Sequence, residues 1–164
     1  MALIKNKNLV PIICGVSYIL MEDIQSFNPG TDISTRYITF QENKKPQGIY
    51  YGVGSAEFTE DEKQDDPGSL FEQRLKIIFP GEDRTNAMTF IGLINRPVVI
   101  LLKYSTGLIK IMGCPDNPAI LLTKHQISSK QSNKELDFIC TSTDPAYVWD
   151  LQHLPPEVEW EEEQ

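Results

Sequence analysis

The stretch Val98-Val99-Ile100-Leu101-Leu102 is a short, continuous apolar run rich in β-branched residues. Such a run predicts a strand that is covered on both of its faces. The turn Ser105-Thr106-Gly107 follows, and residues 108–112 then resume the apolar character. Gly107 can supply the positive φ that a short loop often requires. The sequence therefore predicts a β-hairpin at this point, and the rest of the fold is built around it.

Further strands are predicted on either side of this hairpin. Residues 70–79 alternate apolar and charged side chains, which predicts a strand with one solvent-exposed face. After that strand, Asp83 can cap a short helix that ends near Asn95, because Pro97 disfavours helical geometry before it. The remaining predicted strands are residues 11–20, 35–40, 49–53, 119–127 and 136–140.

These elements predict a mainly β fold class. We expect an antiparallel β-sandwich or half-barrel of about seven to eight strands, with one short α-helix and a long central loop arm. Residues 1–150 are expected to form a single β-rich domain, with the loop arm at about 41–69. Residues 151–164 form a proline-containing acidic tail, which is either a frayed end or an extended arm that places Trp160 in a pocket of a neighbouring subunit.

The acidity of the chain is concentrated in two places. The net charge is −8, and residues 60–66 contribute −4 while residues 157–164 contribute −5. The rest of the chain is therefore nearly neutral. No basic stripe is present that could neutralise phosphates, which argues against binding of nucleic acid through its backbone.

The cysteines and histidines lack the spacing of a reactive or metal-binding site. Cys14, Cys114 and Cys140 are odd in number, distant from one another and without a CxxC motif, so they are expected to be buried thiols. His125 and His153 have no cysteine or carboxylate at metal-ligand spacing. These residues are therefore expected to be structural.

The remaining candidate motifs also lack the features that a binding site, a catalytic site or a membrane anchor requires. The glycine-rich stretch at 52–55 lacks the following lysine and the strand-to-helix context of a phosphate loop. The carboxylates of residues 57–62 lie in a stretch too polar to desolvate one of them for acid–base work. Pro11 and Gly15 interrupt the apolar start of the chain, so no membrane anchor is expected. We therefore expect no enzyme activity, no catalytic residue, no metal and no cofactor.

The central hairpin has more apolar surface than one short helix can bury. A second sheet, a neighbouring subunit or both must cover the remainder. The side chains expected at such a subunit contact are Val99, Leu101, Ile109 and Ile111.

Residues from about 50 to 143 resemble the tail tube proteins of long-tailed bacteriophages, particularly those of phages of Bacteroidetes. The resemblance begins with Gly54-Ser55-Ala56-Glu57-Phe58, which leads through an acidic loop to Gly68. It continues with the alternating strand that ends in Ile77-Ile78-Phe79-Pro80-Gly81 and with the helix after it. The paired segments 98–104 and 108–113 and the late strand 135–140 complete the pattern.

This resemblance implies a subunit that assembles with copies of itself. The implied assembly consists of hexameric rings stacked into a tube, in which inner strands join into a continuous barrel and a long loop reaches the next ring. DNA passes through without sequence-specific binding, other virion tail proteins are further partners, and the protein is located in the virion after assembly in the bacterial cytoplasm. Glu57 and Phe58 then join Trp160 among the expected contact residues.

Three alternatives remain open at this stage. One is another head-to-tail connector or tail component. The second is a monomeric or dimeric β-sandwich binding module whose long arm holds a ligand or peptide. The third is an enzyme whose site the sequence does not reveal. Rings or tubes in electron micrographs favour a self-assembling subunit, whereas a compact monomer with a pocket favours the binding module.

Overall fold

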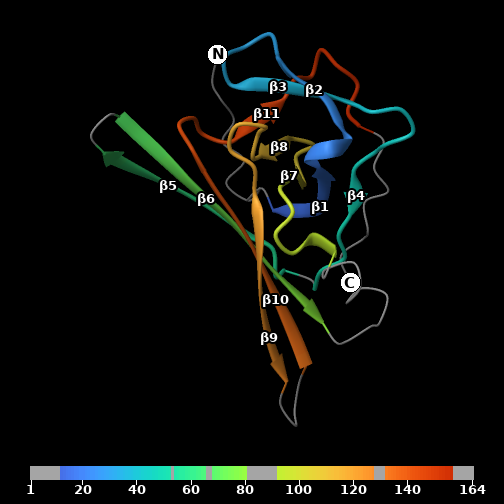
Figure 1. The fold of residues 1–164 in the computed structure, drawn as a ribbon, viewed down its shortest axis with the longest axis vertical. Coiled ribbons are helices and arrows are strands. Elements are labelled where there is room, and N and C mark those ends of the chain that lie inside the picture. Colours follow the sequence, from blue (N-terminus) through green and yellow to red (C-terminus); the bar gives the residue numbers. More distant parts are fainter. Residues whose placement is uncertain (1–11, 53, 66–67, 81–91, 128–131, 157–164) are drawn as a thin grey trace, which may run out of the picture.

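The computed structural model describes residues 12–52, 54–65, 68–80, 92–127 and 132–156, which form two β-sheets (Figure 1). The larger sheet has seven strands in the order β2-β3-β11-β8-β7-β1-β4. Its strands are β1 (Ile13–Leu20), β2 (Ile24–Pro29), β3 (Thr35–Phe40), β4 (Gln47–Gly48), β7 (Val98–Tyr104), β8 (Ile109–Met112) and β11 (Tyr147–Trp149). A single 3-10 turn, η1 (Met21–Asp23), joins β1 to β2.

The smaller sheet is built from two hairpins. Its strands are β5 (Glu57–Asp65), β6 (Gly68–Pro80), β9 (Ile120–Ile127) and β10 (Ser132–Ser142), in the order β5-β6-β10-β9. All three neighbouring pairs in this sheet are antiparallel. The larger sheet is antiparallel except between β11 and β3, which run parallel.

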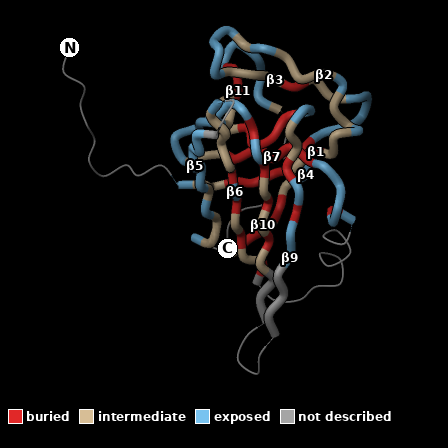
Figure 2. Tube along the Cα trace, turned by 60° about the vertical axis from the view of Figure 1, so that its left-hand side comes forward, coloured by how far each residue is buried: buried red, intermediate tan, exposed pale blue. Residues whose placement is uncertain are grey.

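The main core lies between the two sheets, and β7 is at its centre. Val98, Ile100 and Leu102 of β7 face Leu75 and Phe138 of the smaller sheet in one buried cluster. Burial is concentrated on the strands where the two sheets meet (Figure 2).

A second cluster lies on the other face of β7. Val99 and Leu101 pack there with Ile19, Ile38 and Trp149, which come from other strands of the same curled sheet. All five residues from Val98 to Leu102 have a relative exposure of 0%. The prediction of a strand covered on both faces is therefore confirmed.

The predicted fold class, a mainly β sandwich or half-barrel, is confirmed. The predicted number of strands was too low, because the described residues form eleven. The four strands that the sequence did not predict are β2, β4, β5 and β11. One of them, β5, occupies residues 57–65, so the central arm predicted at 41–69 is not a loop throughout.

Two further expectations concern a strand and a helix. The first needs correction, and the second falls mostly outside the described residues. The strand predicted at residues 49–53 does not form at residues 49–52, and residue 53 lies outside the described part of the chain. Ile49 and Tyr51 are nevertheless buried, and the Ile49 N–H donates a hydrogen bond to the Val16 carbonyl at 2.8 Å. The helix predicted after Asp83 lies mostly in residues 81–91, outside the described part of the chain, and only Gly92 and Leu93 are seen as helical.

Candidate assembly surface

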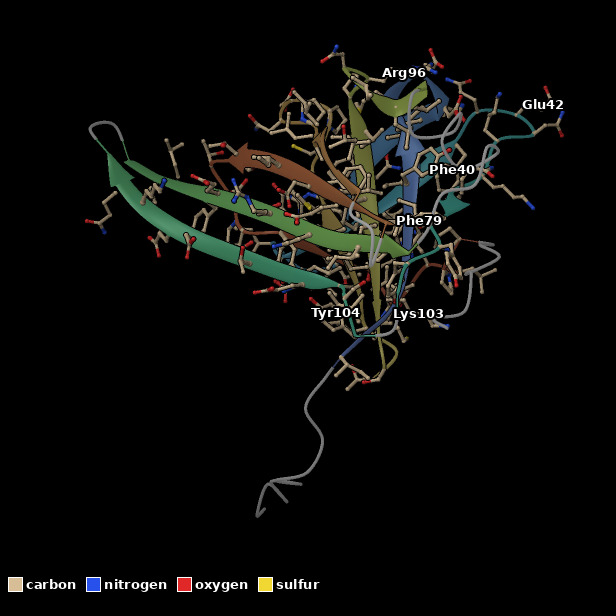
Figure 3. The ribbon with its side chains drawn as sticks, turned by 90° about the horizontal axis from the view of Figure 1, so that it is seen from below. Phe40, Glu42, Phe79, Arg96, Lys103 and Tyr104 are labelled. Carbon is tan, nitrogen blue, oxygen red and sulfur yellow. The ribbon has the colours of Figure 1, made fainter. Side chains whose placement is uncertain are left out.

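The hairpin formed by β5 and β6 projects from the body of the molecule (Figures 1 and 3). Its two strands pair in continuous register from Glu57 opposite Lys76 to Asp65 opposite Gly68. Beyond Lys76, β6 continues toward Pro80 and remains paired with β10. The hairpin is therefore anchored at one end by the core and is exposed at the other.

The side chains of β6 alternate between the core and solvent. Leu75 and Ile77 are fully buried, whereas Arg74 is exposed and Lys76 is partly exposed. The face of the smaller sheet that points away from the larger sheet therefore has charged side chains. We call it the outer face.

Ion pairs cross this outer face between neighbouring strands. Lys63 Nζ lies 2.8 Å from Glu72 Oε2, and Lys76 Nζ lies 3.4 Å from Glu135 Oε1. The hydrogen bond to Glu72 raises the pKa of Lys63, and the same bond lowers the pKa of the Glu72 carboxyl. Both groups are held in their charged forms, so neither is suited to proton transfer near neutral pH.

Strand β5 forms one edge of the smaller sheet. It is nine residues long, and β6 is its only partner strand among the described residues. The segment before β11 also contacts this strand, since the Ala146 N–H donates to Glu60 Oε2 at 2.8 Å. An edge of this length presents a row of backbone N–H and C=O groups to which another strand can bind.

A pocket of about 320 Å³ lies at the base of the hairpin. Its lining is mainly apolar, with one carboxylate, and consists of Ile12, Ile13, Gly54, Ala56, Glu57, Phe58 and Tyr104. Lys110 Nζ lies 5.1 Å from the centroid of the Phe58 ring and 5.7 Å from that of Tyr104. Burial, together with the negative charge of Glu60, raises the pKa of Tyr104, which therefore stays neutral.

The residues predicted as subunit contacts fall into two groups. Val99, Leu101 and Ile111 are 0% exposed within the single chain, where they belong to the second buried cluster. The cover that was expected from a neighbouring subunit is supplied by the curl of the seven-stranded sheet itself. These three side chains are therefore core residues and offer a neighbour no surface.

The other predicted contacts are at or near the surface. Ile109 is partly buried at the margin of the second cluster. Glu57 is exposed at the start of β5, and Phe58 is partly buried beside it in the wall of the pocket. The structure thus brings Glu57 and Phe58 together at the base of the projecting hairpin. Trp160 lies outside the described residues.

Asp150 forms a cluster that the sequence did not reveal. Its carboxylate accepts hydrogen bonds from the Thr31 N–H and hydroxyl, both at 3.1 Å, and from the Gln152 N–H at 3.2 Å. His153 Nδ1 lies 3.2 Å from Asp150 Oδ2, and the His153 ring stacks on Tyr37 with 3.6 Å between centroids. The cluster ties the segment after β11 to the turn between β2 and β3. No local motif could have predicted it, because Thr31 and Asp150 are 119 residues apart.

The three cysteines form no disulfide bond. Cys114 and Cys140 are buried and Cys14 is partly buried, and all three are free thiols. Burial, with a smaller effect of Cys114, raises the pKa of Cys140 to about 11. Because the thiolate is the nucleophilic form, Cys140 is a poor nucleophile at neutral pH. Within the described residues, no three His, Cys, Asp or Glu side chains are grouped to hold a metal ion.

No protein-family model matches the sequence, and neither a curated protein nor a solved structure was found to match the chain. In the part of the chain that the structure describes, no helix is long and apolar enough to cross a membrane.

Proposed function

We propose that this chain is a non-enzymatic structural subunit that assembles with copies of itself, of the kind represented by phage tail tube proteins. The observation that supports the proposal is the nine-residue edge strand β5 on a projecting hairpin. One side of β5 pairs with β6, and no described strand pairs with its other side. Monomeric proteins usually shorten, cover or distort such an edge, whereas assembling proteins use it for pairing between chains.

The strand order of the smaller sheet suits lateral assembly. Its two outermost strands are β5 and β9. A single parallel bridge joins Ile94 to Leu121 near the start of β9, and beyond Leu121 only β10 pairs with β9 among the described residues. If β5 of one copy lies beside β9 of the next, the sheets join into one, and closure into a ring leaves no free edge.

In such a ring, the outer face of the smaller sheet lines the interior. The acidic side chains placed on that face by the strand alternation are Glu57, Asp61, Glu72, Glu135 and Asp137, and the described basic ones are Lys63, Arg74 and Lys76. Among the described side chains of this face acids outnumber bases, and a lining with that balance does not retain phosphates by charge. This balance suits a conduit through which DNA passes without sequence-specific binding. The proposal includes hexameric rings, other tail proteins as partners, and a location in the virion.

The test of lateral assembly uses two neighbouring proline variants, Asp61→Pro and Glu62→Pro. Successive N–H groups of a strand point to opposite sides, so one of these two residues directs its N–H toward β6 and the other directs it away. Proline at the outward position leaves the β5–β6 ladder intact, yet it blocks a strand that would pair from outside. Both substitutions remove one negative charge, so each controls for the electrostatic effect of the other.

Light scattering and negative-stain electron microscopy of the full chain give the result. We expect rings or tubes for the parent protein. One of the two proline variants should keep the parent's melting temperature and remain unassembled. If both proline variants fold and assemble like the parent, copies do not pair through β5. If the parent is a monomer at every concentration tested, the proposed function is wrong.

A binding module is the second candidate function, and the pocket at the base of the hairpin favours it. Its volume is at the lower end of the range for small-molecule sites. The apolar wall and the Glu57 carboxylate would suit a small ligand with an apolar body and a cationic group. Two results together would support this function instead. The parent protein is a monomer, and such ligands raise the melting temperature of the parent but not that of the Glu57→Gln variant.

A further inference from the structure

Two buried cysteines lie close together at the turn that leads from the larger sheet to the smaller one. Cys114 follows the end of β8, and the turn continues through Asn117 to the start of β9 at Ile120. The Cys114 N–H donates to the Asn117 carbonyl at 3.1 Å, and the Asn117 N–H donates to the Cys114 carbonyl at 3.0 Å. These two hydrogen bonds close a tight turn that holds the backbone of Cys114 in place.

Cys140 of β10 reaches the same turn from the smaller sheet. Its thiol donates to the Asn117 carbonyl oxygen at 3.0 Å, and that oxygen also accepts the Cys114 N–H. The Asn117 side-chain amide lies 4.0 Å from Cys114 Sγ, so both sulfur atoms contact one residue. The negative charge of a Cys114 thiolate also contributes to the raised pKa of Cys140, as expected for two neighbouring thiols.

The third cysteine lies away from this pair. Cys14 is in β1 at the level of Tyr104, the last residue of β7. The turn that contains Cys114 lies instead at the start of β7, where the backbones of Val98 and Ala119 exchange two hydrogen bonds. A seven-residue strand spans about 20 Å, whereas a disulfide needs Cα atoms within about 7 Å. Cys14 is therefore a natural control for the other two thiols.

We infer that Cys114 and Cys140 form a site of oxidative modification, at which hydrogen peroxide converts the two thiols to a disulfide bond. Cys114 reacts first, because its side chain is 9% exposed and that of Cys140 is 2% exposed. Its sulfur attacks one peroxide oxygen, the O–O bond breaks, and Cys114 becomes a sulfenic acid while the second oxygen leaves as water with the thiol proton.

The second step closes the disulfide. The Cys140 sulfur attacks Cys114 Sγ, the S–O bond of the sulfenic acid breaks, and the hydroxyl group leaves as water with the Cys140 proton. Two thiols are oxidised, and one peroxide is reduced to two waters. Because the thiolate is the attacking form and the pKa of Cys140 is about 11, this step should become faster as the pH rises from 7 to 9.

The disulfide joins the two sheets. The turn at Cys114 continues from β8 of the larger sheet, whereas Cys140 belongs to β10, which pairs with both β6 and β9 in the smaller sheet. The bond closes a segment that contains β9, and such a closure restricts the unfolded chain. The oxidised chain is therefore expected to resist unfolding better than the reduced chain. This inference goes beyond the proposed self-assembly and does not depend on it.

The test treats the folded, reduced full-length chain with hydrogen peroxide, and alkylation and peptide mass spectrometry then locate the disulfide. We expect a linked peptide that contains Cys114 and Cys140, and no disulfide at Cys14. The melting temperature of the oxidised chain should be about 5–10 °C above that of the reduced chain. Dithiothreitol should remove both the link and the rise in melting temperature.

Two alanine variants provide matched controls. Cys14→Ala retains the pair, so peroxide should produce the same link and the same rise as in the parent. Cys140→Ala removes the thiol that closes the disulfide, so its melting temperature should not rise. In this variant, dimedone, which labels sulfenic acids, should label Cys114 more strongly than in the parent. Circular dichroism establishes that each variant is folded, and the parent and Cys14→Ala decide the test if Cys140→Ala does not fold.

Three results would overturn the inference. They are a folded chain in which peroxide produces no link between Cys114 and Cys140, a disulfide that includes Cys14, and a melting temperature that falls when the link forms. The last result would show that the bond strains the fold. All of these measurements report on single chains, so they are independent of whether copies assemble into rings.

Discussion

Asp150 shows how much of the fold depends on single polar residues that are distant in sequence. It is buried, at 2% relative exposure, and its carboxylate accepts hydrogen bonds from Thr31, Gln152 and His153. Burial raises the pKa of Asp150, but these hydrogen bonds lower it by more, and the net pKa lies below the usual value. The charged carboxylate is therefore the form that stabilises the fold.

The pH dependence of stability follows from this shift. A group whose pKa is lower in the folded state contributes stability above its unfolded pKa and loses it as the pH falls through the folded pKa. We expect Asp150→Asn to lower the melting temperature at pH 7 and to reduce the acid-induced loss of stability between about pH 5 and pH 2. Thermal unfolding followed across that range measures both effects. Asp116→Asn, at an exposed position, is the control, and an equally steep acid slope in Asp150→Asn and the parent would contradict the prediction.

Leu101 tests the second buried cluster. Its side chain is 0% exposed between strands of the same sheet, so Leu101→Ala leaves a cavity that the curled sheet cannot readily fill. We expect a loss of about 2–5 kcal/mol in the free energy of unfolding, measured by chemical denaturation. Leu108→Ala, at a side chain that is 39% exposed, should cost far less. Equal midpoints for the two variants would show that the assignment of the core face is wrong.

At the scale of elements, the sequence predicts the strands that have strong apolar patterns and misses those formed by pairing alone. The predicted strand at 70–79 lies within β6, and the predicted run at 98–102 begins β7. Strand β5 was missed because its residues are mostly charged, and it is a strand because β6 supplies a full ladder of partners. Strand β11 has only three residues, and its partners in β3 are more than a hundred positions away.

The turns give a matched pair of glycines for a test at this scale. Gly107 and Gly113 both have positive φ, at +89° and +92°. A Cβ at Gly107 would meet nothing within 4 Å, whereas one at Gly113 would lie 3.1 Å from the backbone nitrogen of Ala119. Gly107→Ala should therefore cost about 1–2 kcal/mol from backbone strain alone, and Gly113→Ala should cost more. Urea denaturation of both variants measures the difference, and a smaller cost at Gly113 would contradict the stated packing.

At the scale of the whole molecule, the sequence identifies apolar residues but does not show what covers them. Val99, Leu101 and Ile111 were expected at a subunit contact because the predicted elements left one face of the hairpin uncovered. The curl of the seven-stranded sheet covers that face, and curl depends on long-range strand order that local patterns do not encode. The acidic segment was evident from the sequence. Its position on a hairpin that projects from the body became evident only from the register of β5 and β6.

The placement of β11 also has a consequence for the synthesis of the protein. Strands β2 and β3 are joined to the rest of their sheet through β11, which lies between β3 and β8. A nascent chain therefore makes β3 early, but β3 obtains this neighbour only after the ribosome has added Tyr147–Trp149. Contacts between segments so far apart form slowly, because the intervening chain must first be brought together. A chain that stops before Tyr147 leaves β3 without that neighbour, so the half-barrel can be completed only after the residues of β11 have been translated.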